Sequence, residues 1–302
     1  ALLIFVVIGD GPTGVDMAKL KIEVLHARAK THGVPLRERL IAELPARAAM
    51  LSSLRAVLGL RDAIPAVARL SERFLGFAAG RSLPRWSSTP FRDAEADATG
   101  TVVLFADTFN RWFEPENLRA ALRVLHATGH AVRVPAAAGR PLCCGRTFLA
   151  AGMVDRARAE ARRTIEALAG SDDPVIGLEP SCLLTLRDEF PSLLPGDASQ
   201  ALAGRALLLS EFLAREAKAG RATPRFRPMQ ATLYIHGHCH QKAHNAFAPA
   251  VAALRAIPEL TVKPIASSCC GMAGAFGYQA ETADVSRAMA EARSMRRPRS
   301  RN

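Results

Sequence analysis

Two pairs of adjacent cysteines are the residues of this sequence best suited to chemistry. Cys143-Cys144 and Cys269-Cys270 each precede a glycine, and the two other cysteines are Cys182 and Cys239. Adjacent cysteines do not form an unstrained disulfide with each other, because their Cα atoms are only about 3.8 Å apart. Two neighbouring thiols before a glycine, where the backbone can turn sharply, suit the binding of neighbouring irons. We therefore predict a metal cluster with these ligands: Cys143, Cys144, Cys182, Cys239, Cys269 and Cys270.

Composition restricts the classes of function. The 302 residues are 49% hydrophobic, which is enough for a sizeable core, and Lys and Arg outnumber Asp and Glu by 40 to 28. The basic residues are scattered without interleaved aromatics, so we predict no nucleic-acid partner and interpret the dense run 296–301 as a tail. The apolar run 1–8 is too short to span a bilayer and lacks the basic leader of a signal peptide. We expect a reducing, cytoplasmic location, peripheral at most to the inner face of the membrane.

The first part of the chain is predicted to be helical and without chemistry of its own. After a turn at 10–16, apolar residues recur on one face of a helix that stops at Gly33: Met17, Leu20, Val24 and Ala27. Further helices are predicted over 36–58 and 64–77, with breaks at Pro45 and Pro65. We predict a small all-α unit over 1–78 and a linker, rich in Pro, Ser and Gly, over 79–100.

From residue 101 strands and helices alternate, which predicts an α/β fold with parallel strands. Strands are predicted at 102–105, 131–134 and 174–178, and helices lie between them. A helical insert over 202–217 follows, and the order then starts again with strands at 232–235 and 260–265. The two Cys-Cys-Gly steps stand 126 residues apart, so we interpret 101–302 as two pseudo-repeated βαβ units.

Each repeat offers ligand positions at the carboxyl ends of its strands, where open α/β sheets bind ligands. Cys239 ends the first strand of the second copy, whereas the equivalent place near Asp107 in the first copy has no cysteine. Cys182 follows the third strand of the first copy, and the same step in the second copy passes Asn302, so we expect that copy to be truncated. A helix opening after each Cys-Cys-Gly should lower the pKa of its thiols.

Three histidines alternate just before and after Cys239, at 236, 238 and 240. With Cys239 they would supply ligands for Zn²⁺ or a single iron; alternatively, one histidine hydrogen-bonds a cluster sulfur and tunes its potential, or all are ordinary polar residues at a strand end. Lys242 would favour a reduced, more anionic cluster, and Arg146 and Glu179 would orient the turns. The residues predicted to support the ligands are His236, His238, His240, Gly145, Gly271 and Lys242.

Four motifs resemble the cysteine-rich iron–sulfur half of FAD-linked 2-hydroxyacid oxidoreductases. They are Leu142-Cys-Cys-Gly145, Glu179-Pro-Ser-Cys182, His236-Gly-His-Cys-His-Gln-Lys242 and Cys269-Cys-Gly-Met-Ala-Gly-Ala-Phe-Gly277. This group includes proteins similar to bacterial D-lactate dehydrogenase and glycolate oxidase, and its cysteine-rich module is related to one of the subunits of heterodisulfide reductase. Members usually carry a ferredoxin-type cysteine cluster before the step at 12–16, but residues 1–10 contain no cysteine.

The resemblance implies a [4Fe–4S] cluster, with a non-cubane form as one option, and FAD in an upstream domain that this chain lacks. It implies electron transfer from that flavin, in a fused or separate partner, to a quinone, a cytochrome or a second flavoprotein. No residue of this fragment is then catalytic towards the hydroxyacid. Two alternatives stay open on the residues alone: thiol–disulfide chemistry at the Cys-Cys-Gly steps, and a zinc-holding interaction domain.

Overall fold

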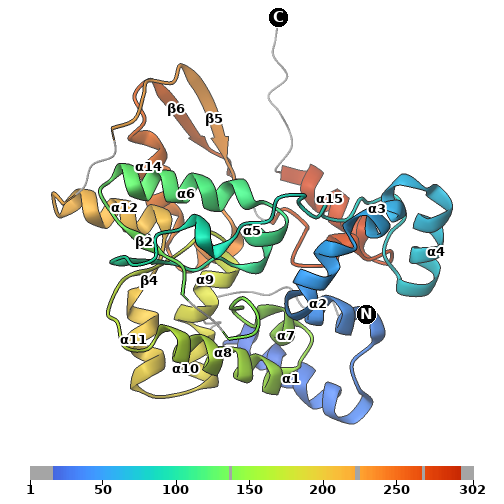
Figure 1. Cartoon of the computed structure of the whole chain (residues 1–302). Coiled ribbons are helices and arrows are strands. Elements are labelled where there is room, and N and C mark those ends of the chain that lie inside the picture. Colours follow the sequence, from blue (N-terminus) through green and yellow to red (C-terminus); the bar gives the residue numbers. More distant parts are fainter. Residues whose placement is uncertain (1–15, 136–137, 222–224, 267–268, 294–302) are drawn as a thin grey trace, which may run out of the picture.

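A computed structural model of the chain describes residues 16–135, 138–221, 225–266 and 269–293 (Figure 1). Helices dominate, and the strands form two parallel sheets. The predicted α/β class is thereby confirmed. The apolar run 1–8 and the basic run 296–301 lie outside the described residues. Within the described ranges, no helix combines the length and apolar character needed to cross a membrane.

Four helices make up the described N-terminal part: α1 (Met17–His32), α2 (Leu36–Ser53), α3 (Arg55–Ala63) and α4 (Pro65–Leu75). Asp16 caps α1 by accepting the backbone N–H groups of Ala18 and Lys19, and the helix ends at Gly33, as predicted. The predicted break at Pro45 is wrong, because α2 continues through it. Ala42 and Ala48 on either side of Pro45 are buried, so packing holds this stretch helical. Pro65, in contrast, is the first residue of α4, where a backbone N–H would have no partner within the helix.

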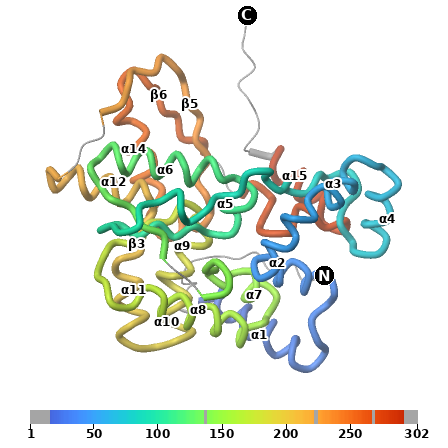
Figure 2. Tube along the Cα trace, viewed as in Figure 1, coloured from blue at the N-terminus to red at the C-terminus, as the bar shows by residue number. Residues whose placement is uncertain are grey.

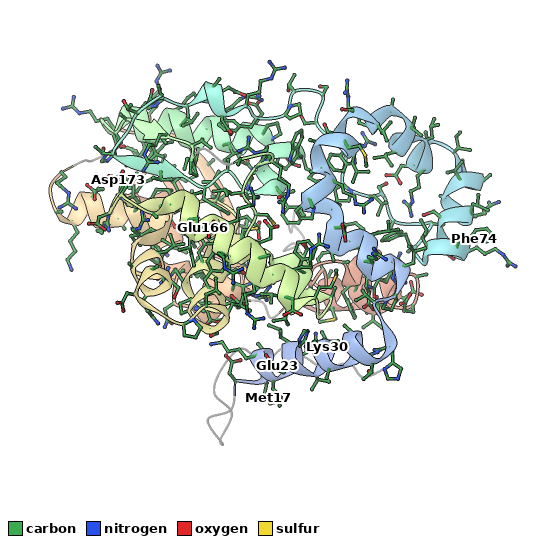
Figure 3. The ribbon with its side chains drawn as sticks, turned by 60° about the horizontal axis from the view of Figure 1, so that its bottom comes forward. Met17, Glu23, Lys30, Phe74, Glu166 and Asp173 are labelled. Atoms are coloured by element: carbon green, nitrogen blue, oxygen red, sulfur yellow. The ribbon has the colours of Figure 1, made fainter. Side chains whose placement is uncertain are left out.

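The apolar face predicted for α1 is not buried. Met17, Leu20 and Val24 expose 40%, 46% and 56% of their surface, and Phe74 on α4 exposes 70%. Figure 3 shows Met17 at one end of α1 and Phe74 at the outer edge of α4. The helical periodicity of this region therefore predicts the helices correctly but not a core of their own.

The N-terminal helices pack against the last described segment of the chain. Arg37 forms an ion pair with Glu281, Phe77 pairs with Gln279 in an isolated antiparallel bridge, and Arg81 Nε donates to the carbonyl oxygen of Gly277 at 2.9 Å. The tube in Figure 2 shows the red end of the chain beside the blue helices. These contacts hold the segment that follows the second Cys-Cys-Gly.

The larger sheet has four parallel strands in the order β2-β1-β3-β4. Its strands are β1 (Val102–Leu104), β2 (Val132–Arg133), β3 (Val175–Gly177) and β4 (Ala206–Leu208). Strand β4 lies within the predicted helical insert, which is therefore wrong at those residues; β4 pairs with β3, and its end residues are buried. The helices around this sheet are α5 (Thr108–Trp112), α6 (Pro115–Ala127), α7 (Arg146–Ala150), α8 (Val154–Leu168), α9 (Pro180–Arg187), α10 (Glu189–Leu193), α11 (Asp197–Arg205) and α12 (Leu209–Lys218).

The core lies on both faces of this sheet. Val103 belongs to one hydrophobic cluster, together with Cys144 and Cys182, whereas Val102 and Leu104 belong to the cluster on the opposite face. Such two-sided burial is typical of central parallel strands. The predicted linker 79–100 contains a short 3-10 helix (Asp93–Glu95), and its Phe91 is buried in the second cluster.

The smaller sheet pairs β5 (Ala231–Ile235) with β6 (Leu260–Pro264) in parallel over five residues. Helices α13 (Cys239–Ala243) and α14 (Phe247–Arg255) connect the two strands, which gives the second βαβ unit. A 3-10 helix (Phe276–Tyr278) and α15 (Ala283–Arg293) complete the described chain. The second Cys-Cys-Gly does not open a helix directly, contrary to prediction, because turns and the 3-10 helix lie between it and α15.

Candidate metal centre

The first Cys-Cys-Gly and the end of β3 bring three thiols together. Cys143 and Cys144 lie in the loop between β2 and α7, and Cys182 lies in the first turn of α9. All three are at most 5% exposed. The side chain of Cys144 forms hydrogen bonds with those of both Cys143 and Cys182. We call Cys143, Cys144 and Cys182 the first thiol set.

The second unit builds a similar but more open arrangement. Cys239 is the first residue of α13, just after β5, and Cys269 and Cys270 follow β6. Cys239 hydrogen-bonds Cys269 and interacts electrostatically with both Cys269 and Cys270. Cys239 and Cys269 are partly exposed, and Cys270 is exposed. We call these three residues the second thiol set.

The two Cys-Cys-Gly turns have the same local geometry. The backbone N–H of Gly145 donates to Sγ of Cys143 at 3.4 Å, and that of Gly271 donates to Sγ of Cys269 at 3.3 Å. Both glycines have a positive φ, of 76° and 80°, which a residue with a Cβ adopts only at a cost. The sequence repeat thus corresponds to a repeated structure that places a donor against the first sulfur of each pair.

The helix caps show how the first strands of the two units correspond. Asp107 caps α5 and His238 caps α13, so Thr108 occupies the place of Cys239. Asp107 accepts backbone N–H groups from Phe109 and Asn110, both at 3.0 Å. Its burial raises its pKa to about 6 despite these hydrogen bonds. The first set therefore has a capping carboxyl group and a buried threonine where the second set has a histidine and a cysteine.

The pKa values of four thiols are raised, whereas the sequence predicts lowered pKa values at the Cys-Cys-Gly steps. The hydrogen bond to Cys144 and then burial raise the pKa of Cys143. Cys143 acts to lower the pKa of Cys144, but Cys182 and burial raise it more. For Cys182 the bond to Cys144 lowers the pKa, yet burial brings it to about 12. Burial also raises the pKa of Cys239. Burial and the neighbouring thiols therefore raise the pKa of these cysteines, whereas a helix end would lower it.

Side chains next to the two sets join them. Arg146 follows the first Cys-Cys-Gly, and its Nη2 donates to Nε2 of His240, the neighbour of Cys239, at 2.9 Å. On the other side, His238 Nε2 approaches Ser181 Oγ at 3.4 Å and Glu179 Oε1 at 3.9 Å. The structure thus brings the six cysteines together as two sets of three with contacting neighbours, rather than as six sulfurs in direct contact.

The predicted supporting histidines differ in environment. Burial lowers the pKa of His236, with Lys242 as the next cause, and burial also lowers the pKa of His238. For His240, burial and then the charge of Arg146 lower the pKa to about 3, so its ring is neutral at physiological pH. The rings of His238 and His240 stack at 5.3 Å between centroids.

Of the residues described, no three His, Cys, Asp or Glu side chains gather around a point where a single metal ion would bind. The described side chains therefore do not form a ready-made zinc or single-iron site from His236, His238, His240 and Cys239, and this alternative stays a prediction. An iron–sulfur cluster makes a different demand, because its ligands surround several irons instead of converging on one.

Two observations fit such a cluster. Each set supplies three soft sulfur donors beside a backbone N–H that donates to sulfur. In addition, Nδ1 of His240 is buried and has no hydrogen-bond partner. A buried donor of this kind is suited to a sulfur of a bound cluster.

Two residues at the contact between the two thiol sets are not predicted from the sequence. Glu189 pairs with Arg146 from 43 residues away, and no local pattern signals a contact over that separation. Ser181 lies directly before Cys182, and that place beside a predicted ligand is a signal by which it could be found.

A family model described as "Cysteine-rich domain" (CCG) matches residues 106–187, which include the first thiol set. The chain is 29% identical over 220 residues to one of the subunits of anaerobic glycerol-3-phosphate dehydrogenase from Escherichia coli. It is 31% identical over 199 residues to D-2-hydroxyglutarate dehydrogenase of Pseudomonas putida, and 24% identical over 294 residues to the Escherichia coli protein of that name.

These matches cover different shares of the proteins. They include 69%, 63% and 89% of this chain, respectively, but only 54%, 18% and 27% of those relatives. The chain thus spans about half the length of the glycerol-3-phosphate dehydrogenase relative and less of the others. No solved structure matches the chain significantly. Residues 106–187 therefore match a CCG-type cysteine-rich domain, in a chain that is homologous to parts of these dehydrogenases.

Proposed function

We propose that the chain is the electron-transfer portion of an FAD-dependent 2-hydroxyacid oxidoreductase, of the type that oxidises lactate or glycolate, and that it passes electrons from the flavin to an acceptor. One observation carries the proposal: two sets of three thiols, built on equivalent Cys-Cys-Gly turns, lie beside contacting side chains. The homology to dehydrogenases supports the redox role.

Each thiol set would hold an iron–sulfur centre of the [4Fe–4S] class, either cubane or non-cubane. Such a centre, when bound, supplies a site that accepts and returns single electrons. The chain's own residues bind and tune it. The N–H groups of Gly145 and Gly271 donate to sulfur, which favours the more anionic state. Lys242 acts electrostatically on Cys239 and would favour the same state.

The flavin would lie in a partner that is either fused upstream or a separate polypeptide. The greater length of the relatives supports further domains. One relative is a subunit of a dehydrogenase, which supports a complex. The acceptor would be a quinone, a cytochrome or a second flavoprotein, reached on the cytoplasmic side. The division of the chain into 1–78, 79–100 and a cysteine-rich part over 101–302 also stays a proposal.

Anaerobic reconstitution of the full chain with iron and sulfide tests this function. We expect bound iron and acid-labile sulfide, and a broad visible absorption that dithionite bleaches. C144S should remove the iron of the first set and C239S that of the second, whereas S199A, a change at a buried residue in α11, should leave both.

Uptake of neither iron nor sulfide by the wild-type chain would contradict the proposal. A colourless protein in which Cys239 and Cys269 form a disulfide reversibly would support thiol–disulfide chemistry instead. A colourless protein that holds zinc would support the interaction-domain alternative. Absorption spectra, thiol titration and metal analysis of the same sample separate these outcomes.

A further inference from the structure

One hydrogen bond links the two thiol sets through residues that lie one or two positions after a cysteine of each set. Arg146 comes after Cys144-Gly145, and His240 comes after Cys239, 94 residues further along the chain than Arg146. The bond joins Nη2 of the arginine to Nε2 of the histidine at 2.9 Å. A contact that starts from both ligand motifs is a direct route for one thiol set to influence the other.

The bond also fixes which nitrogen of His240 carries the proton. A guanidinium group only donates hydrogen bonds, so Nε2 of His240 must accept, and the ring proton of the neutral imidazole resides on Nδ1. Nδ1 is buried and has no hydrogen-bond partner, whereas the backbone N–H of His240 donates to His238 at 3.2 Å. The residue next to Cys239 therefore carries one buried N–H that has no hydrogen-bond partner.

Arg146 is itself held in place. Its Nη1 pairs with Glu189 at the start of α10, and only 26% of its side chain is exposed. The guanidinium acts electrostatically on both Cys144 and Cys182 of the first set. One side chain therefore places a positive charge at the first set and orients a histidine at the second.

We propose that Arg146 is a positioning residue that couples the two thiol sets. It holds His240 as the Nδ1–H tautomer, so that this N–H donates to a sulfur of the second centre, while its charge stabilises the reduced first centre. This inference rests on the proposed function for its effect on potentials. Its effect on the histidine tautomer holds without any metal.

The first experiment uses the metal-free full chain, labelled with ¹⁵N at histidine. Wild type should show His240 as the Nδ1–H tautomer, and R146Q should shift it towards Nε2–H, with partial rescue in R146K. R187Q is the matched control, because Arg187 has a similarly buried side chain that pairs with a carboxylate, Glu211, instead of a histidine. An unchanged tautomer in folded R146Q would overturn the positioning role.

The second experiment compares potentials in the reconstituted chain, with C144S and C239S assigning each signal to a set. R146Q should shift the one-electron equilibrium of both centres towards oxidation by about tenfold, which equals about 59 mV. In an H240N background, R146Q should move the second centre less than about threefold, because the orienting bond is already lost.

The coupling would be overturned if R146Q shifted the potential of the second centre equally in the wild-type and H240N backgrounds, or in neither. Absence of iron from the wild type would overturn the proposed function and the coupling with it, whereas the tautomer result would still decide the positioning role. Should R146Q fail to fold, H240N carries the test, since it removes the orienting bond, keeps a polar side chain and should shift the potential of the second centre alone.

Discussion

Gly145 donates its backbone N–H to the sulfur of Cys143, two residues before it, and Gly271 repeats this bond with Cys269. The distances agree within 0.1 Å and the φ angles within 4°. The two turns nevertheless differ in their surroundings. The first lies in the buried core, whereas the second leads into turns on a more open surface. The shared geometry is therefore a property of the Cys-Cys-Gly step and not of its environment.

Replacement of Gly271 by alanine should lower the stability of the chain strongly. A Cβ there would overlap the backbone oxygen of Ser286 on α15 and lie 3.0 Å from its carbonyl carbon, in addition to the strain of φ +80°. We expect a loss of about 3 kcal/mol or more in the free energy of unfolding, measured with urea.

Gly274→Ala is the control for this change. Gly274 has φ +64°, but its Cβ would meet nothing within 4 Å, so only the backbone strain of about 1 kcal/mol applies. Equal losses in the two variants would show that the contact with Ser286 is unimportant.

The thiols of the metal-free chain should react in groups. Cys270 is exposed, Cys239 and Cys269 are partly exposed, and the three cysteines of the first set are buried. Because reaction requires access and thiolate, a disulfide reagent such as DTNB should modify Cys270 first, then the other two of the second set, and the first set only in denaturant. Mass spectrometry after timed quenching checks the order. Early labelling of Cys182 would contradict the structure.

Asp107 should make stability fall as pH rises. Its pKa is raised to about 6 in the folded chain, above the value of about 3.9 for an unfolded aspartate. Its contribution is therefore fully present below about pH 4 and is lost as pH rises through about 6, by roughly 3 kcal/mol.

Urea unfolding of metal-free wild type and D107N between pH 4 and pH 8 measures this loss as the difference between the two. Asparagine keeps the cap of α5 and does not ionise, so D107N is a matched reference. A difference that stays constant with pH would contradict the raised pKa.

Arg61 should anchor α3 to the segment that follows α4. Its guanidinium donates to the backbone oxygens of Ala78 at 2.6 Å and Arg81 at 2.5 Å and pairs with Asp62. R61A leaves one buried and one partly buried acceptor unpaired, so we expect a loss of about 2–3 kcal/mol in the free energy of unfolding. R55A, at the exposed start of the same helix, should change it by less than about 0.5 kcal/mol. Similar losses in both variants would rule out the anchoring contacts.

The sequence predicts most of the elements that position the thiols. Strands β1, β2 and β3 and the βαβ order follow from short apolar runs between helical patterns. The runs of β1 and β3 are continuous because central parallel strands are buried on both faces. Strand β4 is not predicted, since its three residues lie between two helices and have the composition of a helix. Pairing with β3, a non-local contact, decides its conformation.

Only part of the candidate site can be predicted from the sequence. Spacing groups the cysteines by type, but the division into two sets and the Arg146–His240 bond depend on how the two units pack. The pKa prediction is wrong for the same reason: a helix end is visible in sequence, whereas burial of Cys143 and Cys144 is not. Local sequence patterns predict turns and helix caps, whereas tertiary packing determines the pKa values of the thiols.

Strand β5 has no neighbouring strand along one edge among the described residues, so its main-chain N–H and C=O groups have no sheet partner there. Among the described residues it pairs with β6 alone, whereas β1 has a neighbour on either side, and Leu233 and Tyr234 on β5 are 38% and 50% exposed. An uncovered, apolar strand border is a template on which another polypeptide can add. The purified chain should therefore self-associate through this edge of β5. The yield of soluble protein should depend on protein concentration more than on temperature.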